Sequence, residues 1–246
     1  MKDEQKFLSA WPKHRPPLPP KNQECYEKEY AANRQGASFF SRISTGLEGW
    51  MHRQVARHES GGARILELGA GTLNHLDYEA KFQAYDVVEP FDALYAKSPN
   101  LAKVNDVYAD IEEIDTSRRY DRIISVAVLE HLTDLPGIVR RAASLLAPDG
   151  VFQAGIPAEG GMLWGLSWRC TTGLAYRART GASYKALMQH EHVNDAWEIQ
   201  QVLQHYFKSV KIRRFFLPWR HLALYEYIEA RLPLRKDLSG ESPSTL

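Results

Sequence analysis

Two glycines one residue apart follow a short apolar run in the stretch ARILELGAGT, and their spacing suggests chemistry. Gly69 and Gly71 leave the backbone bare at the point where a buried strand would end. In an open α/β sheet, the turn after the first strand lets the backbone approach a ligand closely. Glu89 stands 20 residues after Gly69, at the end of the next apolar run, where a carboxylate can bind both ribose hydroxyls. The pattern predicts a site for a nucleoside-containing ligand.

The same glycines disfavour a dinucleotide. The motif GxGxxG would place a third glycine at position 74, where this chain has Asn74. A further carboxylate, Glu67, lies within the first apolar run, and burying it without a partner would be costly. We therefore expect a polar ligand or adjacent N–H groups to satisfy Glu67.

Two short segments offer a base that could accept a proton from a substrate. Glu130 and His131 occur in VLEHL, and His190, Glu191 and His192 occur in HEHVN. Histidine is the better-matched base near neutral pH. The alternative for the first pair is a helix start that only frames a pocket. The two histidines of HEHVN are too few ligands for a metal site of their own.

These residues must be positioned by short apolar runs that alternate with helix-compatible segments. Such alternation predicts an α/β fold: a Rossmann-like, doubly wound sheet of seven mostly parallel strands, with helices on both faces and an antiparallel terminal hairpin. The strands are expected at residues 63–68, 84–89, 103–108, 120–126, 150–155, 209–216 and 221–228. Only the turn 217–220 separates the last two, which favours a hairpin.

Four ordered segments resemble the class I S-adenosylmethionine-dependent methyltransferases. They are ILELGAGT, VVEP, YADIEEID and the run from YDRIISVAVLEHL to GIP. The resemblance is strong over residues 63–157 and weak elsewhere. It implies a methyltransferase with S-adenosyl-L-methionine as its cofactor. The cofactor-binding residues that it implies are Glu67, Gly69, Ala70, Gly71, Glu89, Pro90, Asp110, Ile111, Ser125 and Val126.

The resemblance also implies a place for each part of the cofactor. Glu67 and the two glycines would lie against the methionine portion, and Glu89 would bind the ribose. Asp110 would accept a hydrogen bond from the adenine amino group, with Ile111 beside it as a packing surface. The alternative for Asp110 is that it only caps the following turn.

The sequence departs from the family pattern at two positions near the reacting end. Ser125 and Val126 would close the fourth strand beneath the sulfonium. The family often has a glycine where this chain has Leu73, which puts the local path of the loop in doubt. A subset of O-methyltransferases binds a divalent metal with ExxEH, but this chain reads AVLEH, with Ala127 in place of the first carboxylate. We therefore expect no metal.

The predicted reaction is methyl transfer to a small-molecule acceptor, by O- or N-methylation of a phenol, sugar or glycan precursor. The expected catalytic residues are His131, Glu130 and His192. One alternative is a nucleic-acid methyltransferase, although the Asn/Asp-Pro-Pro-aromatic signature of amino-group DNA methylation is absent after the fourth strand. Another is a protein of this fold that binds the cofactor without turnover.

Composition limits the partners of the chain. The 31 Lys and Arg against 30 Asp and Glu give a formal charge of +1 with no long run of one sign, which disfavours nucleic acid. No apolar run is long enough for a membrane span. Cys25 and Cys170 follow no disulfide or CxxC spacing, and we expect a cytoplasmic protein. The oligomeric state stays open.

The chain divides into four expected regions. Residues 1–23 are a Pro-rich mobile tail, 24–60 an N-terminal helical lid, 61–238 the core, and 239–246 a frayed end. The core carries an insertion, residues 157–194, rich in aromatic and cationic residues. Such an insertion suits the pocket of a flat or anionic acceptor, or else forms an amphipathic helical cap.

Overall fold

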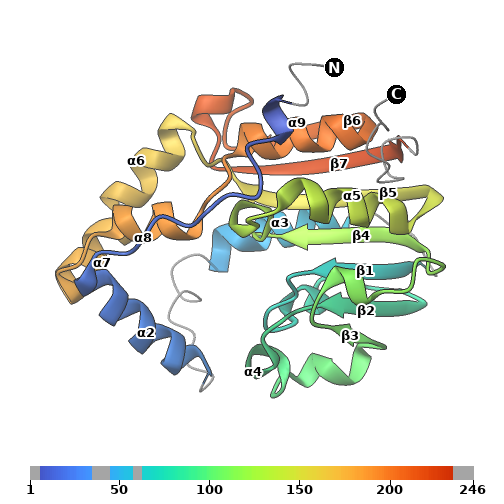
Figure 1. Ribbon diagram of the computed structural model, residues 1–246, viewed down its shortest axis with the longest axis horizontal. Helices are drawn as coiled ribbons and strands as arrows, with labels where there is room; N and C mark the ends of the chain where they lie inside the picture. Colours follow the sequence, from blue (N-terminus) through green and yellow to red (C-terminus); the bar gives the residue numbers. More distant parts are fainter. Residues whose placement is uncertain (1–5, 35–44, 58–62, 235–246) are drawn as a thin grey trace, which may run out of the picture.

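A computed structural model describes residues 6–34, 45–57 and 63–234. Its strands form one sheet in the order β3-β2-β1-β4-β5-β7-β6 (Figure 1). They are β1 Arg64–Leu68, β2 Ala84–Val88, β3 Val107–Tyr108, β4 Tyr120–Val126, β5 Leu146–Pro157, β6 Phe207–Phe215 and β7 Tyr225–Pro233. The strands from β3 to β5 pair in parallel, while β7 runs antiparallel to β5 and β6. The predicted fold class, including the terminal hairpin, is confirmed.

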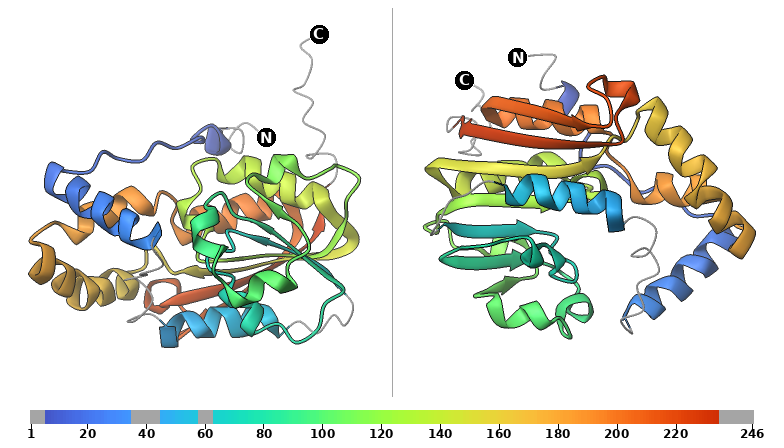
Figure 2. Two further views of the ribbon diagram at one scale, coloured as in Figure 1. Left: turned by 90° about the horizontal axis from the view of Figure 1, so that it is seen from below. Right: turned by 180° about the vertical axis from the view of Figure 1, so that it is seen from behind.

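Alternating side chains of the strands enter two cores on opposite faces of the sheet. In β1, Leu66 packs with the first core and Ile65 with the second, because successive side chains point to opposite faces. Helices α5 (Leu135–Leu145) and α9 (Ala196–Tyr206) cover the first face, and α3 (Thr45–Ala56) lies on the other (Figure 2).

Only β4 has its expected range, and β3, β5 and β7 differ most from theirs. β5 runs over Leu146–Pro157 rather than over 150–155. β3 has only two residues, because Pro99–Lys103 forms a 3-10 helix, η2, whose first turn the Ser98 side chain caps. β7 begins at Tyr225 rather than at His221, because Arg220–Leu222 is also a 3-10 turn, η5. The hairpin connection is therefore longer than the predicted four residues.

The insertion folds into three helices of its own. They are α6 Met162–Cys170, α7 Thr172–Thr180 and α8 Tyr184–Glu191, which extend to the left of the sheet in Figure 1. Helix α2, Pro20–Arg34, packs on them: Tyr26 joins a small core with Tyr176 and Leu187, and the Asn22 amide donates to the Ser183 carbonyl. The expected lid helix thus contacts the insertion.

Residues 6–19 differ from the mobile tail expected for positions 1–23. Trp11 is only 8% exposed and its Nε1 donates to Asn194 Oδ1 at 2.9 Å. Burial of this indole fixes the segment against the core. Residues 1–5, 35–44, 58–62 and 235–246, and with them the expected frayed end, lie outside the described part of the chain. Within the described part, no helix is long and apolar enough to cross a membrane.

Candidate active site

The register of the central strands brings the predicted cofactor residues to one edge of the sheet. Leu68 lies beside Val88 and Ser125, and Val88 lies beside Tyr108. The turns that follow β1 to β4 therefore open on the same side. This is the edge at which open α/β sheets bind ligands.

Glu89 ties two of these turns together. Its Oε2 accepts a hydrogen bond from the Gly71 N–H at 2.8 Å, and its Oε1 accepts one from the Phe91 N–H at 3.0 Å. The carboxylate is nearly buried, between Val88 and the exposed Pro90. Each oxygen retains a further lone pair, so the group can still accept bonds from ribose hydroxyls.

The two glycines of the first turn both have a left-handed backbone, with φ of 68° at Gly69 and 52° at Gly71. A Cβ at Gly69 would stand 2.4 Å from a methyl carbon of Val128, whereas a Cβ at Gly71 would meet nothing within 4 Å. Ala70 between them is buried. Gly69 is therefore needed for packing, and Gly71 borders open space.

The loop beyond Gly71 keeps the path that a glycine would give, although Leu73 stands there. Leu73 has φ of 63° and a fully buried side chain, so its burial offsets the strain of a left-handed backbone. The helix expected after this turn is absent: only a short 3-10 turn, η1 (Asn74–Asp77), follows.

Within the chain, a side chain gives Glu67 a hydrogen-bond partner. The Tyr85 hydroxyl, on the neighbouring strand β2, donates to Glu67 Oε2 at 2.8 Å. Burial raises the pKa of Glu67 to about 7, although His75 and the Tyr85 hydrogen bond act in the opposite direction. The carboxyl group is thus easily kept neutral beneath the first turn.

Asp110 shows the capping role that was its alternative assignment. Its Oδ1 accepts a hydrogen bond from the Glu112 N–H at 2.9 Å, at the start of the 3-10 turn Ile111–Glu113. The residue is exposed, which leaves its carboxylate accessible to a further donor. Ile111 is buried in the core rather than open at the edge.

The end of β4 carries a buried hydroxyl. Ser125 is fully buried, and its Oγ has no hydrogen-bond partner among the described residues. Val126, which follows it, is partly exposed. An orphaned hydroxyl beside Gly69 and a partly satisfied carboxylate at Glu89 are donor and acceptor groups that fit an S-adenosyl cofactor.

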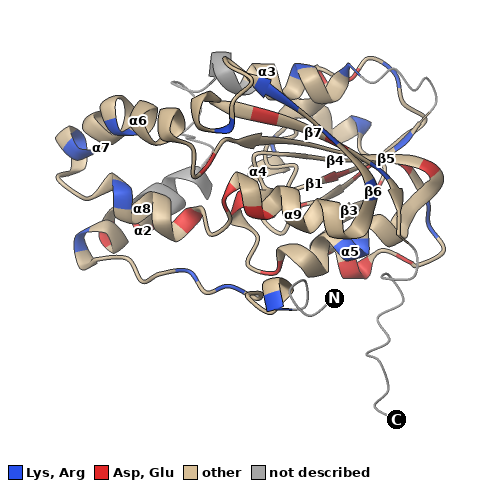
Figure 3. Ribbon diagram, turned by 90° about the horizontal axis from the view of Figure 1, so that it is seen from above, with Lys and Arg blue, Asp and Glu red and all other residues tan. Residues whose placement is uncertain are grey.

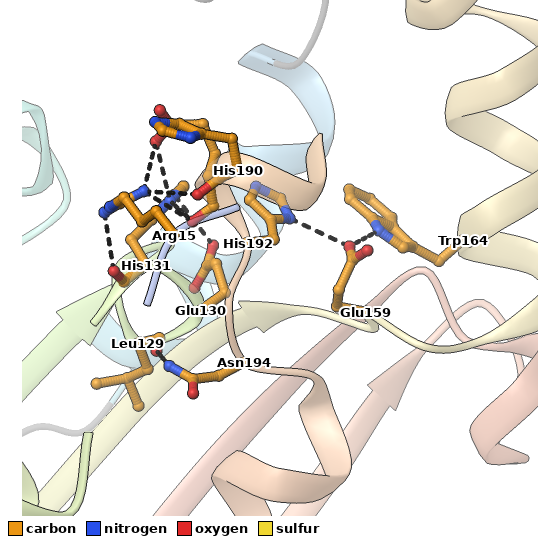
Figure 4. A network of polar contacts seen from close by, with 10 residues as sticks. Arg15, Leu129, Glu130, His131, Glu159, Trp164, His190, His192 and Asn194 are labelled. Atoms are coloured by element: carbon orange, nitrogen blue, oxygen red, sulfur yellow. Dashed lines mark hydrogen bonds and ion pairs between the residues drawn. The ribbon is translucent and has the colours of Figure 1, made fainter. Parts of the chain in front are cut away.

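The three predicted catalytic residues come together beside this edge (Figure 4). The rings of His131 and His192 lie 4.8 Å apart between centroids, edge to face. His131 Nε2 lies 3.9 Å from Glu130 Oε1. Leu129–His131 is a 3-10 turn, η4, and α5 starts only at Leu135, so Glu130 and His131 precede the helix rather than begin it.

His131 is held by Glu191, the second residue of HEHVN. Its Nδ1 lies 2.9 Å from the Glu191 carbonyl oxygen and 3.5 Å from Glu191 Oε2. Burial alone would lower the pKa of His131, but the Glu191 and Glu130 carboxylates outweigh it and the pKa is raised. Burial would likewise raise the pKa of Glu191, yet hydrogen bonds from His131 and Tyr26 and the charge of Arg15 lower it to about 2.

The HEHVN segment is locked onto η4 by main-chain bonds. The carbonyl oxygen of Glu130 accepts from the N–H groups of Val193 and Asn194 at 2.9 and 3.0 Å. The Asn194 amide donates to the carbonyls of Leu129 and Leu132. The Glu130 side chain is buried, and its Oε2 has no hydrogen-bond partner in the described residues. Its carboxylate can therefore accept a bond from a bound molecule.

Sequence reasoning missed two residues of this cluster, Arg15 and Glu159. The Arg15 guanidinium donates to the carbonyls of His131 and His190, both at 3.0 Å. Glu159 Oε2 lies 3.2 Å from His192 Nδ1 and also accepts from Trp164 Nε1. Arg15 lies in the Pro-rich segment and Glu159 follows β5, so no local motif marks either residue.

Glu130, His131 and His192 are also the group that could hold a metal ion among the described residues. Their ligand atoms lie within 4.8 Å of one another. One ion at about 2.1 Å from each ligand holds two of them at most about 4.2 Å apart, so the group would have to contract.

Comparison with known proteins agrees with this geometry. A family model described as a methyltransferase domain matches residues 39–216. Malonyl-[acyl-carrier protein] O-methyltransferase of Bacillus anthracis is 31% identical over 123 residues, which cover 48% of this chain and 45% of that protein. Ubiquinone biosynthesis O-methyltransferase of Rhodopseudomonas palustris (strain BisB5) is 39% identical over 109 residues, covering 37% and 38%. The chain thus spans less than half the length of these relatives.

Solved structures share the fold at low sequence identity. The N-methyltransferase NodS of Bradyrhizobium japonicum, in complex with S-adenosyl-L-homocysteine, has a TM-score of 0.53 at 15% identity, covering 83% of this chain and 97% of that one. The plantazolicin methyltransferase BpumL, also with S-adenosyl-L-homocysteine, has a TM-score of 0.57 at 12% identity, covering 94% and 95%.

Proposed function

This chain belongs to the family of class I S-adenosylmethionine-dependent methyltransferases, and on that premise we propose that it methylates an oxygen or nitrogen of a small-molecule acceptor. The observation that supports the proposal is the meeting of Glu130, His131 and His192 beside the edge where the cofactor turns open. S-adenosylmethionine supplies an electrophilic methyl group on a sulfonium. What the chain must add is position, a proton acceptor and exclusion of water.

The cofactor side holds the nucleoside through preformed groups. Glu89 faces the ribose with lone pairs left over from its bonds to Gly71 and Phe91. Ser125 offers its buried hydroxyl near the reacting end, and Asp110 offers an exposed carboxylate for the adenine. Burial raises the pKa of Glu67 to about 7, so near neutral pH this group carries less negative charge than an ordinary carboxylate and repels the carboxylate of the methionine portion less.

His131 is the proposed general base. Its Nδ1 is oriented by Glu191, so Nε2 points toward Glu130 and is the nitrogen left to take a proton from an acceptor hydroxyl or ammonium. The charge of Glu191 stabilises the imidazolium that forms. His192, held by Glu159, is the rival base on the insertion side.

The acceptor class is inferred from the side chains that surround Glu130, His131 and His192. Trp164 and Tyr26 lie within hydrogen-bonding or ring-contact distance of the cluster residues, and Arg15 adds positive charge. Aromatic surfaces and a cation suit a phenol, a sugar or a glycan precursor with an anionic group. The curated relatives named above are O-methyltransferases, which favours a hydroxyl or carboxyl oxygen.

The test combines cofactor binding with a transfer assay. Calorimetry with S-adenosylhomocysteine should show binding, and label from S-adenosylmethionine should pass to one member of a panel of phenols, sugars and amines. Binding without transfer to any panel member would favour the cofactor-binding protein without turnover. Transfer to oligonucleotides in place of the panel would favour the nucleic-acid methyltransferase.

A further inference from the structure

A cluster of large apolar side chains is exposed where α6 meets the connection between β6 and β7. Met162 and Leu166 are 72% and 58% exposed, and Phe216 and Trp219 are 64% and 63% exposed. Met162 and Leu166 are four residues apart on α6 and so lie on one face of the helix. Single exposed apolar residues are ordinary, but adjacent groups of this size mark an interaction surface.

The two elements that carry these side chains lie side by side. A Cβ at Gly161, which precedes α6, would stand 3.2 Å from the carbonyl oxygen of Arg220 in η5. The Ala158 N–H also donates to the Leu224 carbonyl at 3.0 Å. Figures 1 and 2 both show the start of α6 against the β6–β7 connection. We call the surface formed by Met162, Leu166, Phe216, Trp219 and Leu222 the apolar face.

Basic residues predominate in the two segments that carry the apolar face. Residues 160–190 contain four Lys or Arg and no Asp or Glu, and residues 199–225 contain five Lys or Arg and no Asp or Glu. Figure 3 shows α6 and α7 with basic segments only. Arg169 is exposed, three residues beyond Leu166, and shares its face of α6. The rest of the chain therefore carries the acids that balance the net charge to +1.

We propose that the apolar face docks this protein on an anionic lipid bilayer. Aromatic and aliphatic side chains that project beside basic residues are the composition of a helix that lies in the membrane interface. Trp and Phe enter the boundary between headgroups and acyl chains, while Lys and Arg contact the anionic headgroups. A polyanion such as nucleic acid would match the charge but not Met162 and Leu166.

Docking through this face places the candidate active site close to the bilayer. Helix α6 carries Trp164 between Met162 and Leu166, and the Trp164 indole donates to Glu159, which in turn contacts His192. An acceptor with a lipid portion could therefore remain in the bilayer while its head group reaches the cluster. The docking itself does not depend on the proposed methyl transfer.

The experiment is co-sedimentation of the full chain with vesicles of phosphatidylcholine alone and of phosphatidylcholine with about a quarter phosphatidylglycerol. We expect binding to the anionic vesicles, little binding to the neutral ones, and a decrease as salt is raised. The double variant Leu166→Ser, Trp219→Ser should bind at least about tenfold more weakly, since two interfacial anchors are removed. Arg169→Gln should weaken binding about fivefold.

The matched control is Leu232→Ser. Leu232 is 51% exposed but lies at the other end of β7, so its removal should leave vesicle binding unchanged within about twofold. Affinity for S-adenosylhomocysteine reports that every variant is folded. Binding that the double variant does not weaken would overturn the proposal. Two other results would also overturn it, if the unaltered protein does not bind vesicles. One is a dimer in sedimentation equilibrium that the double variant abolishes, and the other is a gel shift of duplex DNA that the double variant abolishes.

Discussion

The cofactor edge and the acceptor cluster depend on contacts between residues at different separations along the chain. By the acceptor cluster we mean Glu130, His131 and His192 with the residues that bond to them. At the cofactor edge, Glu89 bonds to Gly71 and Phe91, which are 18 and 2 residues away along the chain. In the acceptor cluster, Arg15 bonds to Glu191 across 176 residues, and His131 bonds to Glu191 across 60. The first site is a property of short motifs, whereas the second exists only once the N-terminal segment and the insertion pack on the core.

The two sites also shift the pKa of a buried carboxyl group in opposite directions. Burial raises the pKa of Glu67 to about 7, so the cofactor strand keeps it close to neutral. The pKa of Glu191 falls to about 2 despite burial, because His131, Tyr26 and Arg15 surround it. Glu191 therefore keeps its negative charge beside His131, the proposed proton acceptor.

The largest expected effect is on the acceptor cluster. His131→Ala should lower the turnover rate by about 10²–10⁴ and leave S-adenosylmethionine affinity within a few-fold, since a general base acts only in the transition state. Turnover and cofactor affinity are measured on the same variant, with His192→Ala as the rival. Unchanged turnover in His131→Ala and a large loss in His192→Ala would move the base to the insertion.

The pH profile sharpens the same prediction. A base is active when deprotonated, and the pKa of His131 is raised, so turnover should rise with pH through a midpoint above the ordinary histidine value of 6.5. Glu191→Gln removes the main group that raises this pKa, so the midpoint should move to lower pH. A midpoint that stays where it was would contradict the pairing of His131 with Glu191.

The next effect concerns the two glycines of the first turn. Gly69→Ala places a methyl group 2.4 Å from Val128 in a left-handed backbone, and we expect a loss of about 3 kcal/mol in unfolding free energy. Gly71→Ala meets no neighbour and should lose only about 1 kcal/mol from backbone strain. Urea unfolding of both variants gives the comparison. Equal losses would show that contact with Val128 does not distinguish the two positions.

A smaller effect is expected on cofactor affinity. Glu89→Ala and Asp110→Ala each remove a charged acceptor, and each should weaken S-adenosylhomocysteine binding by about ten- to a hundredfold, or roughly 1.5–3 kcal/mol. Calorimetry measures both. Asp149→Ala removes an exposed acid near the start of β5, at the opposite end of the strands, and is the control that should bind normally. Affinity like that of the unaltered protein in both test variants would contradict the assignment.

The separation of contacting residues along the chain also explains which features could be predicted from the sequence and which could not. Strand β4 was predicted to its exact residues, and the edge residues Gly69 and Glu89 were placed correctly, because motif and strand pattern are local. The helix expected after Gly71 was wrong, because Leu73 buries its side chain in a turn instead. Arg15 and Glu159 were missed, because only tertiary packing brings them to His131 and His192.

Stability should depend on pH through Glu67. Its folded pKa, about 7, is above the ordinary value of 4.5, so its contribution is fully present below pH 4.5 and is lost as pH rises through 7. Glu67→Gln keeps the acceptor for Tyr85 but cannot ionise. Between pH 5 and pH 8 the stability of this variant should rise by roughly 2–3 kcal/mol relative to that of the unaltered protein. The free energy of unfolding of both proteins is measured with urea at pH 5 and pH 8. An equal change in the two proteins between these pH values would contradict the raised pKa of Glu67.

The smallest expected effect is that of chelation, which should leave turnover unchanged. Ala127 removes one carboxylate of the metal-binding pattern, and the remaining ligand atoms of Glu130, His131 and His192 spread over 4.8 Å. Turnover is measured after dialysis against EDTA and again after Mg²⁺, Mn²⁺ or Zn²⁺ is added. If EDTA abolishes turnover and one ion restores it, the cluster contracts around a metal, and the acceptor is activated by that ion instead of by His131.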